Sequence, residues 1–127
     1  MRVWCWPVLL WPCLALAASG SWSGTVGGPR VAGPGRMYAS APLNPPAPAA
    51  GARIRRVHWR YGVPADRRSI AELCAGQHCV PLNGNRGVSD ALAGTPAAAP
   101  LALRFRLPPG ERRSLQVGVI QLLVDYR

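Results

Sequence analysis

Residues 67–82, with the sequence RRSIAELCAGQHCVPL, constrain the fold of this chain more than any other stretch. Two short apolar runs, 70–74 and 79–82, flank a polar link, and each run meets that link with a cysteine. The pattern predicts a β-hairpin closed at its mouth by a disulfide between Cys74 and Cys79, because residues that face each other across antiparallel strands lie within disulfide reach. Four residues then form the loop, and Gly76 supplies the positive φ that such a loop needs.

Residues 1–17 are predicted to be a cleaved secretory signal peptide. A short positive start precedes an apolar stretch, and Ala15-Leu16-Ala17 fits the small-x-small rule of signal-peptidase cleavage. Cleavage is therefore expected after Ala17, with Ala18 as the next choice, which leaves residues 18–127 as one mature domain. An uncleaved anchor is the weaker alternative, because the apolar stretch is too short for a comfortable membrane span and no stop-transfer pattern follows.

Removal of this leader would leave Cys74 and Cys79 as an even pair in an oxidising compartment. The alternative is two free buried thiols. A loop this short constrains the unfolded chain by only ~2 kcal/mol, so the bridge pins the register of one hairpin. His78 beside the two cysteines also resembles a metal cluster, but three ligands on one turn fall short of the four separated ligands of structural zinc. No metal and no cofactor are expected.

The charge of the chain is strongly basic, with 15 basic residues against 5 acidic ones and a net charge of +10. All the basic residues are arginine, and alanine, glycine and proline are abundant, a combination that fits GC-rich codon usage as well as selection for charge. Such a balance is typical of proteins with nucleic-acid, anionic-lipid or acidic partners. Because an exported protein rarely meets nucleic acid, a solvated basic surface is favoured and no nucleic-acid partner is expected.

The mature chain is a series of short apolar runs separated by turns rich in glycine and proline. Strands are expected at residues 22–26, 37–43, 53–61, 70–74, 79–82, 101–107 and 115–126, while 88–92 is ambiguous between a weak strand and one helical turn. Residues 27–35 are expected to form a loop or an irregular edge, and 44–52 an extended connection. With no amphipathic helix beyond the leader, the fold class is all-β, an antiparallel β-sandwich, with a small β-barrel as the alternative.

Alternation of apolar and polar residues assigns the buried face of each strand. The residues expected to face the core are Val57, Trp59, Tyr61, Ala71, Leu73, Leu101, Leu103, Phe105, Leu107, Leu115, Val117 and Val119. The alternation breaks in two places. The break near residues 55–56 predicts a bulge or an early twist, and the change of parity near 120–121 predicts a bulge or two successive strands.

The candidate binding residues are outward arginines and the aromatic residues beside them. They are Arg53, Arg55, Trp59, Arg60, Tyr61, Arg104 and Arg106. An arginine row next to aromatic rings could bind an acidic or glycan partner. Packing in the core and at the sheet edge is the favoured alternative for the aromatic residues, and a solvated sheet face is the favoured alternative for the arginines.

A catalytic constellation is not visible in the sequence. None of the acidic residues forms a close pair on a strong element, the serines have no nucleophile-elbow setting, and the two histidines have no evident orienting carboxylate. No glycine-rich motif that would hold a phosphate follows a strand and opens a helix. The chain is therefore expected to be neither an enzyme nor a binder of a small-molecule substrate.

An ordered set of short motifs resembles the flagellar FlhE family. The motifs are Trp22 soon after the leader, Ser40-Ala41-Pro42-Leu43, Trp59-Arg60-Tyr61, Leu73-Cys74 with Cys79-Val80, Pro100-Leu101 and the C-terminal Val124-Asp125-Tyr126-Arg127. They extend over essentially the whole mature chain. The departures are the enrichment in arginine, proline and alanine and the long stretch of glycine and proline at residues 27–35, and both concern loops and surface charge.

This resemblance implies a periplasmic, non-enzymatic β-sandwich protein associated with the flagellar type III export apparatus. Such a protein would restrain proton flow through the export gate or regulate export and assembly, with export-gate or basal-body proteins as partners. Two other classes stay open. A periplasmic chaperone or adaptor would lend an exposed sheet edge, residues 37–43 or the last strand, to a partner strand. A glycan-binding module would use the outward arginines and an exposed tryptophan.

Overall fold

The computed structural model describes residues 19–46 and 51–127, and these residues form strands, turns and loops. The strands are β1 (Gly20–Val26), β2 (Arg30–Val31), β3 (Tyr38–Ala39), β4 (Ile54–Tyr61), β5 (Ile70–Ala75), β6 (His78–Leu82), β7 (Arg86–Ser89), β8 (Leu101–Arg106), β9 (Leu115–Gln116) and β10 (Ile120–Tyr126). Within the described ranges there is no helix with the length and apolar character of a membrane span. The predicted leader at residues 1–17 lies outside these ranges.

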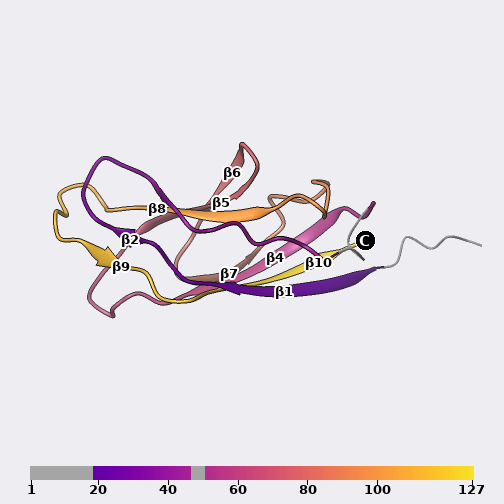
Figure 1. The fold of residues 1–127 in the computed structure, drawn as a ribbon, viewed down its shortest axis with the longest axis horizontal. Helices are drawn as coiled ribbons and strands as arrows, with labels where there is room; N and C mark the ends of the chain where they lie inside the picture. The colour runs from indigo at the N-terminus through magenta and orange to yellow at the C-terminus, as the bar shows by residue number, and fades with distance from the viewer. Residues whose placement is uncertain (1–18, 47–50) are drawn as a thin grey trace, which may run out of the picture.

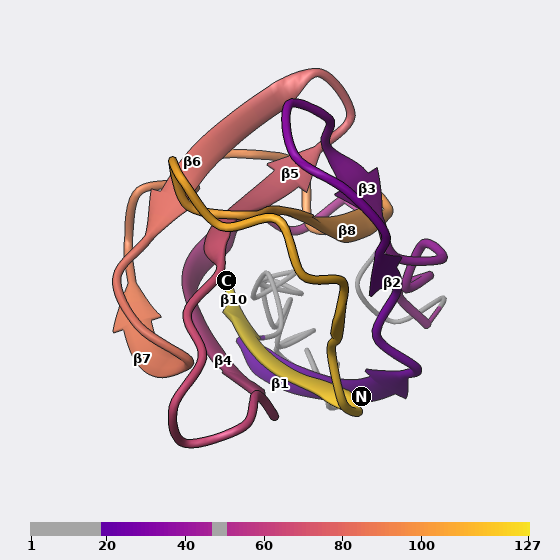
Figure 2. The ribbon, with the colours of Figure 1, turned by 90° about the vertical axis from the view of Figure 1, so that its left-hand side faces the viewer.

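The strands pack as two antiparallel layers. Sheet I has the order β1-β10-β4-β7 and sheet II the order β3-β8-β5-β6, while β2 and β9 form a small two-stranded sheet (Figure 1). An end-on view shows the two four-stranded sheets facing each other, with β2 at their side (Figure 2). The sheets do not close into a barrel, so the predicted β-sandwich is confirmed.

The core fills the space between the two sheets. Of the residues expected to face inward, those that are buried are Val57, Trp59, Tyr61, Ala71, Leu73, Leu101, Leu103, Phe105, Leu107, Leu115 and Val117. The rings of Tyr61 from sheet I and Phe105 from sheet II meet edge to face with their centroids 5.0 Å apart. Alternation of side chains along a strand therefore predicted the buried face correctly for eleven of the twelve residues expected to face the core.

The predicted hairpin and its disulfide are confirmed. Strands β5 and β6 pair in a register that places Cys74 opposite Cys79, and the two sulfurs are bonded. The loop is shorter than expected, because Ala75 and His78 also pair and leave only Gly76 and Gln77 to turn the chain. Gly76 has a φ of 61°, which suits the first central position of a two-residue hairpin turn.

The bulge expected near residues 55–56 is also present. In the pairing of β10 with β4, Asp125 lies opposite Arg56 while Tyr126 lies opposite Ile54, so Arg55 has no partner residue. The extra residue restores the alternation, and both Ile54 and Val57 point into the core.

Val119 was expected to face the core, and this prediction is wrong, since the side chain is 59% exposed. The chain leaves the sheet between β9 and β10, where the Gly118 N–H donates a hydrogen bond of 2.8 Å to the Gly62 carbonyl oxygen. Alternation restarts at Ile120, which is fully buried. The parity change therefore comes at Gly118, slightly earlier in the chain than predicted, and it turns Val119 to solvent.

Three other segments differ in detail from their predictions. Within residues 37–43 only the two residues of β3 form a strand, and Leu43 adds an isolated pairing with Leu101. The ambiguous segment 88–92 divides between the end of β7 and a turn that buries Leu92. The last strand, β10, lies between β1 and β4, so it cannot lend a free edge to a partner strand.

Candidate functional site

Strand β4 divides the predicted binding residues between the two sides of sheet I. Trp59 and Tyr61 point into the core, and their side chains are only 6% and 3% exposed. Arg55 and Arg60 lie on the opposite side and are exposed. Arg53 precedes the strand, is exposed, and donates a hydrogen bond of 3.1 Å to the Gly94 carbonyl oxygen. The local alternation of the strand thus separates the aromatic residues from the arginines.

The other two predicted residues, Arg104 and Arg106, lie on β8 in sheet II. They alternate with the buried Leu103 and Phe105, so they face away from the core on the far side of the sandwich. The seven candidates therefore belong to two outer faces and a shared core, and the fold does not bring them together in one site.

The side chains of Trp59 and Tyr61 on β4 form hydrogen bonds with the turn that follows β6. The Trp59 indole N–H and the Tyr61 hydroxyl both donate hydrogen bonds of 3.2 Å to the carbonyl oxygen of Gly84. The Trp59 ring covers Gly87, where an added Cβ would lie 2.6 Å from a ring atom. Burial raises the pKa of the Tyr61 hydroxyl above its usual 10.0, so Tyr61 stays neutral and able to donate. These contacts give both rings a packing role.

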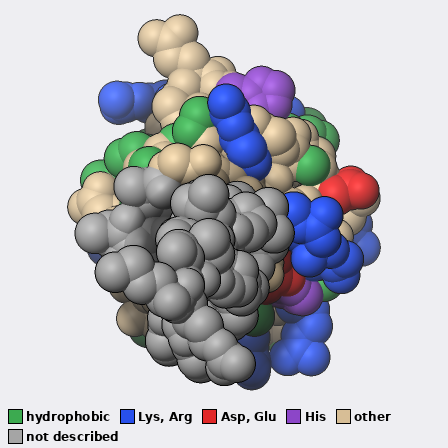
Figure 3. Space-filling view, turned by 90° about the vertical axis from the view of Figure 1, so that its right-hand side faces the viewer, with side chains coloured by type: hydrophobic (Ala, Val, Ile, Leu, Met, Phe, Trp, Pro, Cys, Tyr) green, Lys and Arg blue, Asp and Glu red, His purple; other side chains and the backbone are tan. Residues whose placement is uncertain are grey.

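The arginines of β4 belong to a polar surface, which we call the outer face of sheet I. The pairing of the strands arranges this face in rows: Arg86, Arg60, Gln121 and Thr25; then Val88, His58, Leu123 and Ser23; then Arg56, Asp125 and Ser21. Val88 and Leu123 are among the large apolar side chains that are exposed, at 55% and 39%. A space-filling view from one end shows basic side chains gathered along one flank, beside acidic and histidine side chains (Figure 3). This face is therefore basic, with aliphatic positions between its polar rows.

A histidine and a carboxylate meet on this face. His58 Nε2 lies 3.1 Å from Asp125 Oδ2, and Arg56 Nε lies 4.0 Å from the same oxygen. The sequence did not reveal this pair, because its members are 67 residues apart and only the register of β4 with β10 brings them together. Ser23 lies two strands from His58, about 10 Å by strand spacing, so it cannot act with His58 as a nucleophile–base pair.

Shallow hollows cross the outer face of sheet I. One of about 650 Å³ is lined by residues that include Arg55, Val88 and Asp90. A second, of about 530 Å³, lies over the row of His58 and Leu123. The third, of about 440 Å³, is lined by residues that include Arg60, Arg86, Asn85, Val119 and Gln121. Open hollows of this kind suit contact with another protein chain better than enclosure of a small molecule.

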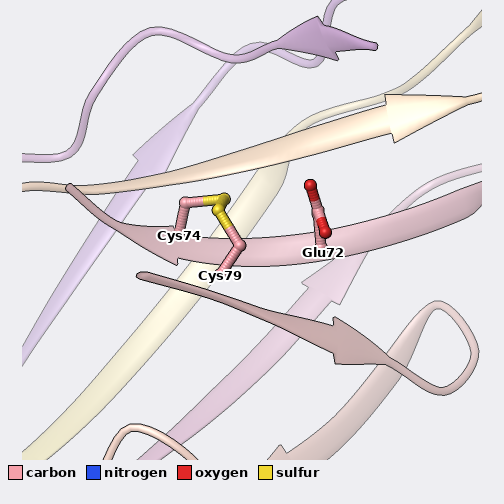
Figure 4. Close-up of side chains that lie close together, drawn as sticks. All are labelled: Glu72, Cys74 and Cys79. Carbon is pink, nitrogen blue, oxygen red and sulfur yellow. A yellow bond between two sulfur atoms is a disulfide. The ribbon is translucent and has the colours of Figure 1, made fainter. Parts of the chain in front are cut away.

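The disulfide has a carboxylate beside it but does not form a metal site. Glu72, Cys74 and Cys79 place one potential ligand atom each within 4.8 Å of one another (Figure 4). The two sulfurs are bonded to each other, so neither is the thiolate that would bind a metal. His78 is exposed at the end of the hairpin and is not part of this group. The residues present therefore do not fit a structural zinc ion, which needs four ligands.

A second charged cluster holds the turn that follows β8. Glu111 accepts hydrogen bonds from the backbone N–H and the guanidinium of Arg113, and Arg67 Nε lies 3.8 Å from its carboxylate. These contacts lower the pKa of Glu111 from 4.5 to about 2. The largest cause is the backbone hydrogen bond of Arg113, followed by its side-chain hydrogen bond and by the charges of Arg113 and Arg67. Arg67 also donates to the Ser114 carbonyl oxygen, so the cluster joins two loops.

The lowered pKa of Glu111 predicts a specific acid sensitivity. The folded state stabilises the ionised carboxylate more than the unfolded state does. The stability that this carboxylate contributes is therefore present above about pH 4.5 and is lost as the pH falls through about 2. Glu111→Gln is therefore expected to lower Tm at neutral pH, and its difference from the wild type should disappear near pH 2. Thermal unfolding followed by circular dichroism across this pH range checks the prediction.

A matched control for this series is Asp90→Asn, since Asp90 is exposed and has no ion pair within the described ranges. A Glu111→Gln difference in Tm that stayed constant from neutral pH to pH 2 would contradict the role assigned to the carboxylate.

Comparison with known proteins gives a consistent result along the chain. Residues 28–127 match the family described as "Flagellar protein FlhE". The flagellar protein FlhE of Escherichia coli K12 is 34% identical over 125 residues, which cover 94% of this chain and 95% of that protein. FlhE of Salmonella typhimurium LT2 is 34% identical over 132 residues and covers all of both chains. A crystal structure of FlhE superposes with a TM-score of 0.77 at 30% identity, covering 86% of this chain and 97% of that chain.

Proposed function

Since this chain belongs to the FlhE family of flagellar proteins, we propose that it is a periplasmic, non-enzymatic protein that acts on the flagellar type III export apparatus. The observation that carries this proposal is the match to flagellar proteins over nearly the full length of both chains. In this proposal the protein restrains proton flow through the export gate or regulates export and assembly, and its partners are export-gate or basal-body proteins.

Two features of the chain support a periplasmic location. Residues 1–17 have the composition and the small-x-small ending of a secretory leader, which would be removed after Ala17. The mature domain carries an oxidised pair, Cys74 and Cys79, and disulfides persist mainly in oxidising compartments such as the bacterial periplasm.

The surface geometry supports a binding protein over an enzyme. The histidine–carboxylate pair on the outer face of sheet I has Ser23 two strands away and lies among open hollows. A role through contact with other proteins suits such a surface, because a rigid sandwich presents it without enclosing a substrate.

A deletion strain tests the proposed function. Loss of the gene is expected to alter motility or cytoplasmic pH only under conditions in which flagella are built, and the wild-type gene should restore both. A pull-down with the purified protein in non-reducing buffer should recover export-gate or basal-body proteins from flagellated cells and not from a flagella-less control. A phenotype of equal size in cells that build no flagella would refute the proposal.

A chaperone or adaptor that binds a partner strand is the second candidate, and the free edge of β1 favours it. Strand β1 is seven residues long, ends sheet I, and has no charged residue or proline, which are the usual protections of a sheet edge. A groove of about 460 Å³ lies beside it, lined by residues that include Trp22, Pro42 and Pro46. Among residues 19–46 and 51–127, the buried Trp22 indole N–H has no hydrogen-bond partner. Equal recovery of unrelated exported subunits from both kinds of cell would favour this candidate.

The glycan-binding alternative loses its structural support. It required an exposed tryptophan beside the outward arginines, whereas Trp22 and Trp59, the two tryptophans within the described ranges, are both buried. Carbohydrate modules of this kind use an exposed aromatic ring, so no glycan site is proposed.

A further inference from the structure

Arg60 and Arg86 form a pair that folding alone does not explain. The two residues lie directly opposite each other on β4 and β7 and line the same hollow on the outer face of sheet I. In the part of the chain that the structure describes, neither guanidinium forms an ion pair or a hydrogen bond with another side chain. Like charges in directly opposite positions destabilise a sheet, so this arrangement has a cost to stability.

Two other strand arginines on these sheets, Arg56 and Arg104, have a carboxylate in the facing position. Arg56 lies opposite Asp125 on β10, and Arg104 lies opposite Glu72 on β5. The fold thus balances these cations in register, whereas it places Arg60 and Arg86 side by side without an acid. The unbalanced positive charge at this end of the outer face is free to bind an anionic group.

The surroundings of the pair combine polar and aliphatic groups. Asn85, Gln121 and the exposed Val119 line the same hollow of about 440 Å³. In the next row, Val88 and Leu123 are exposed on either side of His58. A ligand that fits the whole surface therefore carries negative charge at one position and apolar side chains close by.

We propose that this surface, formed by Arg60, Arg86, Val119, Val88 and Leu123, binds an acidic segment of a partner protein. The planar guanidinium groups match carboxylates in a bidentate geometry, and aliphatic side chains of the same segment cover the three exposed apolar residues. A free inorganic anion would leave those apolar residues uncovered. A glycan would need an exposed ring, and the aromatic side chains of β4 are buried.

This inference rests on the proposed function only for the cellular role of the partner, and the binding itself does not depend on that role. Binding to the surface can be measured with the purified protein and a synthetic probe, without flagellated cells. Failure of the binding test would therefore leave the flagellar role standing, and failure of the deletion experiment would leave the binding surface standing.

The probe is a short peptide of alternating glutamate and valine, titrated into the protein and followed by calorimetry and by amide chemical shifts. Arg60→Gln/Arg86→Gln is expected to weaken binding about tenfold or more, because two charge-assisted contacts are lost. The matched control, Arg106→Gln/Arg112→Gln, removes the same charge from exposed arginines elsewhere and should bind like the wild type. Peptides with glutamine for glutamate, or serine for valine, should both bind more weakly.

Thermal unfolding separates binding from folding in these variants. Loss of the like-charged pair should leave Tm unchanged or raise it, so weaker binding cannot be attributed to a damaged fold. Binding of the glutamate–valine peptide that was equally strong in both double variants would overturn the proposal. Two other results would also overturn the proposal. If the peptide did not bind and only Arg60→Gln/Arg86→Gln lost binding to phosphatidylglycerol vesicles, the surface would be assigned to a membrane. If only that variant lost self-association, the surface would be assigned to a second copy of the chain.

Discussion

Replacing Trp59 by alanine is expected to lower the free energy of unfolding by about 3–5 kcal/mol, the usual cost of removing a buried aromatic side chain. The Trp59 ring packs over Gly87, and its indole N–H donates to the Gly84 carbonyl oxygen, so its loss leaves a cavity and removes one of the two hydrogen bonds which that oxygen accepts. Since small domains are stable by only ~5–15 kcal/mol, the variant should be close to unfolding. Urea denaturation followed by far-UV circular dichroism measures the change.

Two variants make this result specific. Leu123→Ala removes an apolar side chain that is 39% exposed on the outer face of sheet I, and it should change the free energy of unfolding by less than Trp59→Ala. Trp59→Phe keeps most of the buried area and loses the hydrogen bond, so it should fall between the two. If Trp59→Ala retained the stability of the wild type but lost binding to a glycan, Trp59 would be a binding residue and its assignment to the core would be wrong.

The features predicted well from the sequence depend on short-range spacing. The disulfide hairpin follows from two cysteines that meet one tight turn, and the buried faces of β4 and β8 follow from a period of two along each strand. The bulge at Arg55 follows in the same way from a local break in alternation. Each of these features is determined by the geometry of one strand or one hairpin.

Strand order and pairing between distant strands could not be predicted in this way. The contact of His58 with Asp125 and the placement of β10 inside sheet I depend on the register of strands that are far apart in the chain. That register is set by the packing of both sheets and by loops without a distinctive turn chemistry. Val119 was misplaced for a related reason, because the backbone contact of Gly118 with Gly62 interrupts an apolar run that otherwise alternates regularly.

The candidate site was predicted in part. Arg60 was identified as an outward residue, but its neighbour Arg86 was not, because residues 83–87 are rich in asparagine and glycine and no strand was expected there. The alternation of Arg86 and Val88 across Gly87 was the available signal, and it is only four residues long in β7. Glycine is needed at position 87 because of packing between strands, since the Trp59 ring occupies the space that a side chain would fill there.

Replacing Phe105 by alanine is the second large effect expected, about 3–5 kcal/mol of unfolding free energy. Phe105 is the largest of the fully buried side chains, and it lies on β8 between its partners Tyr38 and Ala71. Because it spans the space between the two sheets, its removal leaves a cavity that neither rigid sheet can close. Urea denaturation measures the loss, and Arg106→Ala, on the outer face of the same strand, is the matched control that should cost far less.

The contact of Phe105 with Tyr61 allows a stricter test of where Tyr61 acts. The two rings meet with centroids 5.0 Å apart and an interplanar angle of 81°, an arrangement that contributes about 0.5–1.5 kcal/mol beyond buried area. A double-mutant cycle of Tyr61→Leu and Phe105→Leu should therefore give a coupling energy of that size. A coupling of zero would mean that the rings do not meet in solution, and Tyr61 would then be available to a partner. A coupling in the expected range assigns the Tyr61 ring to the core, so that partner contacts on this side of the molecule fall to the outward residues of the same strands.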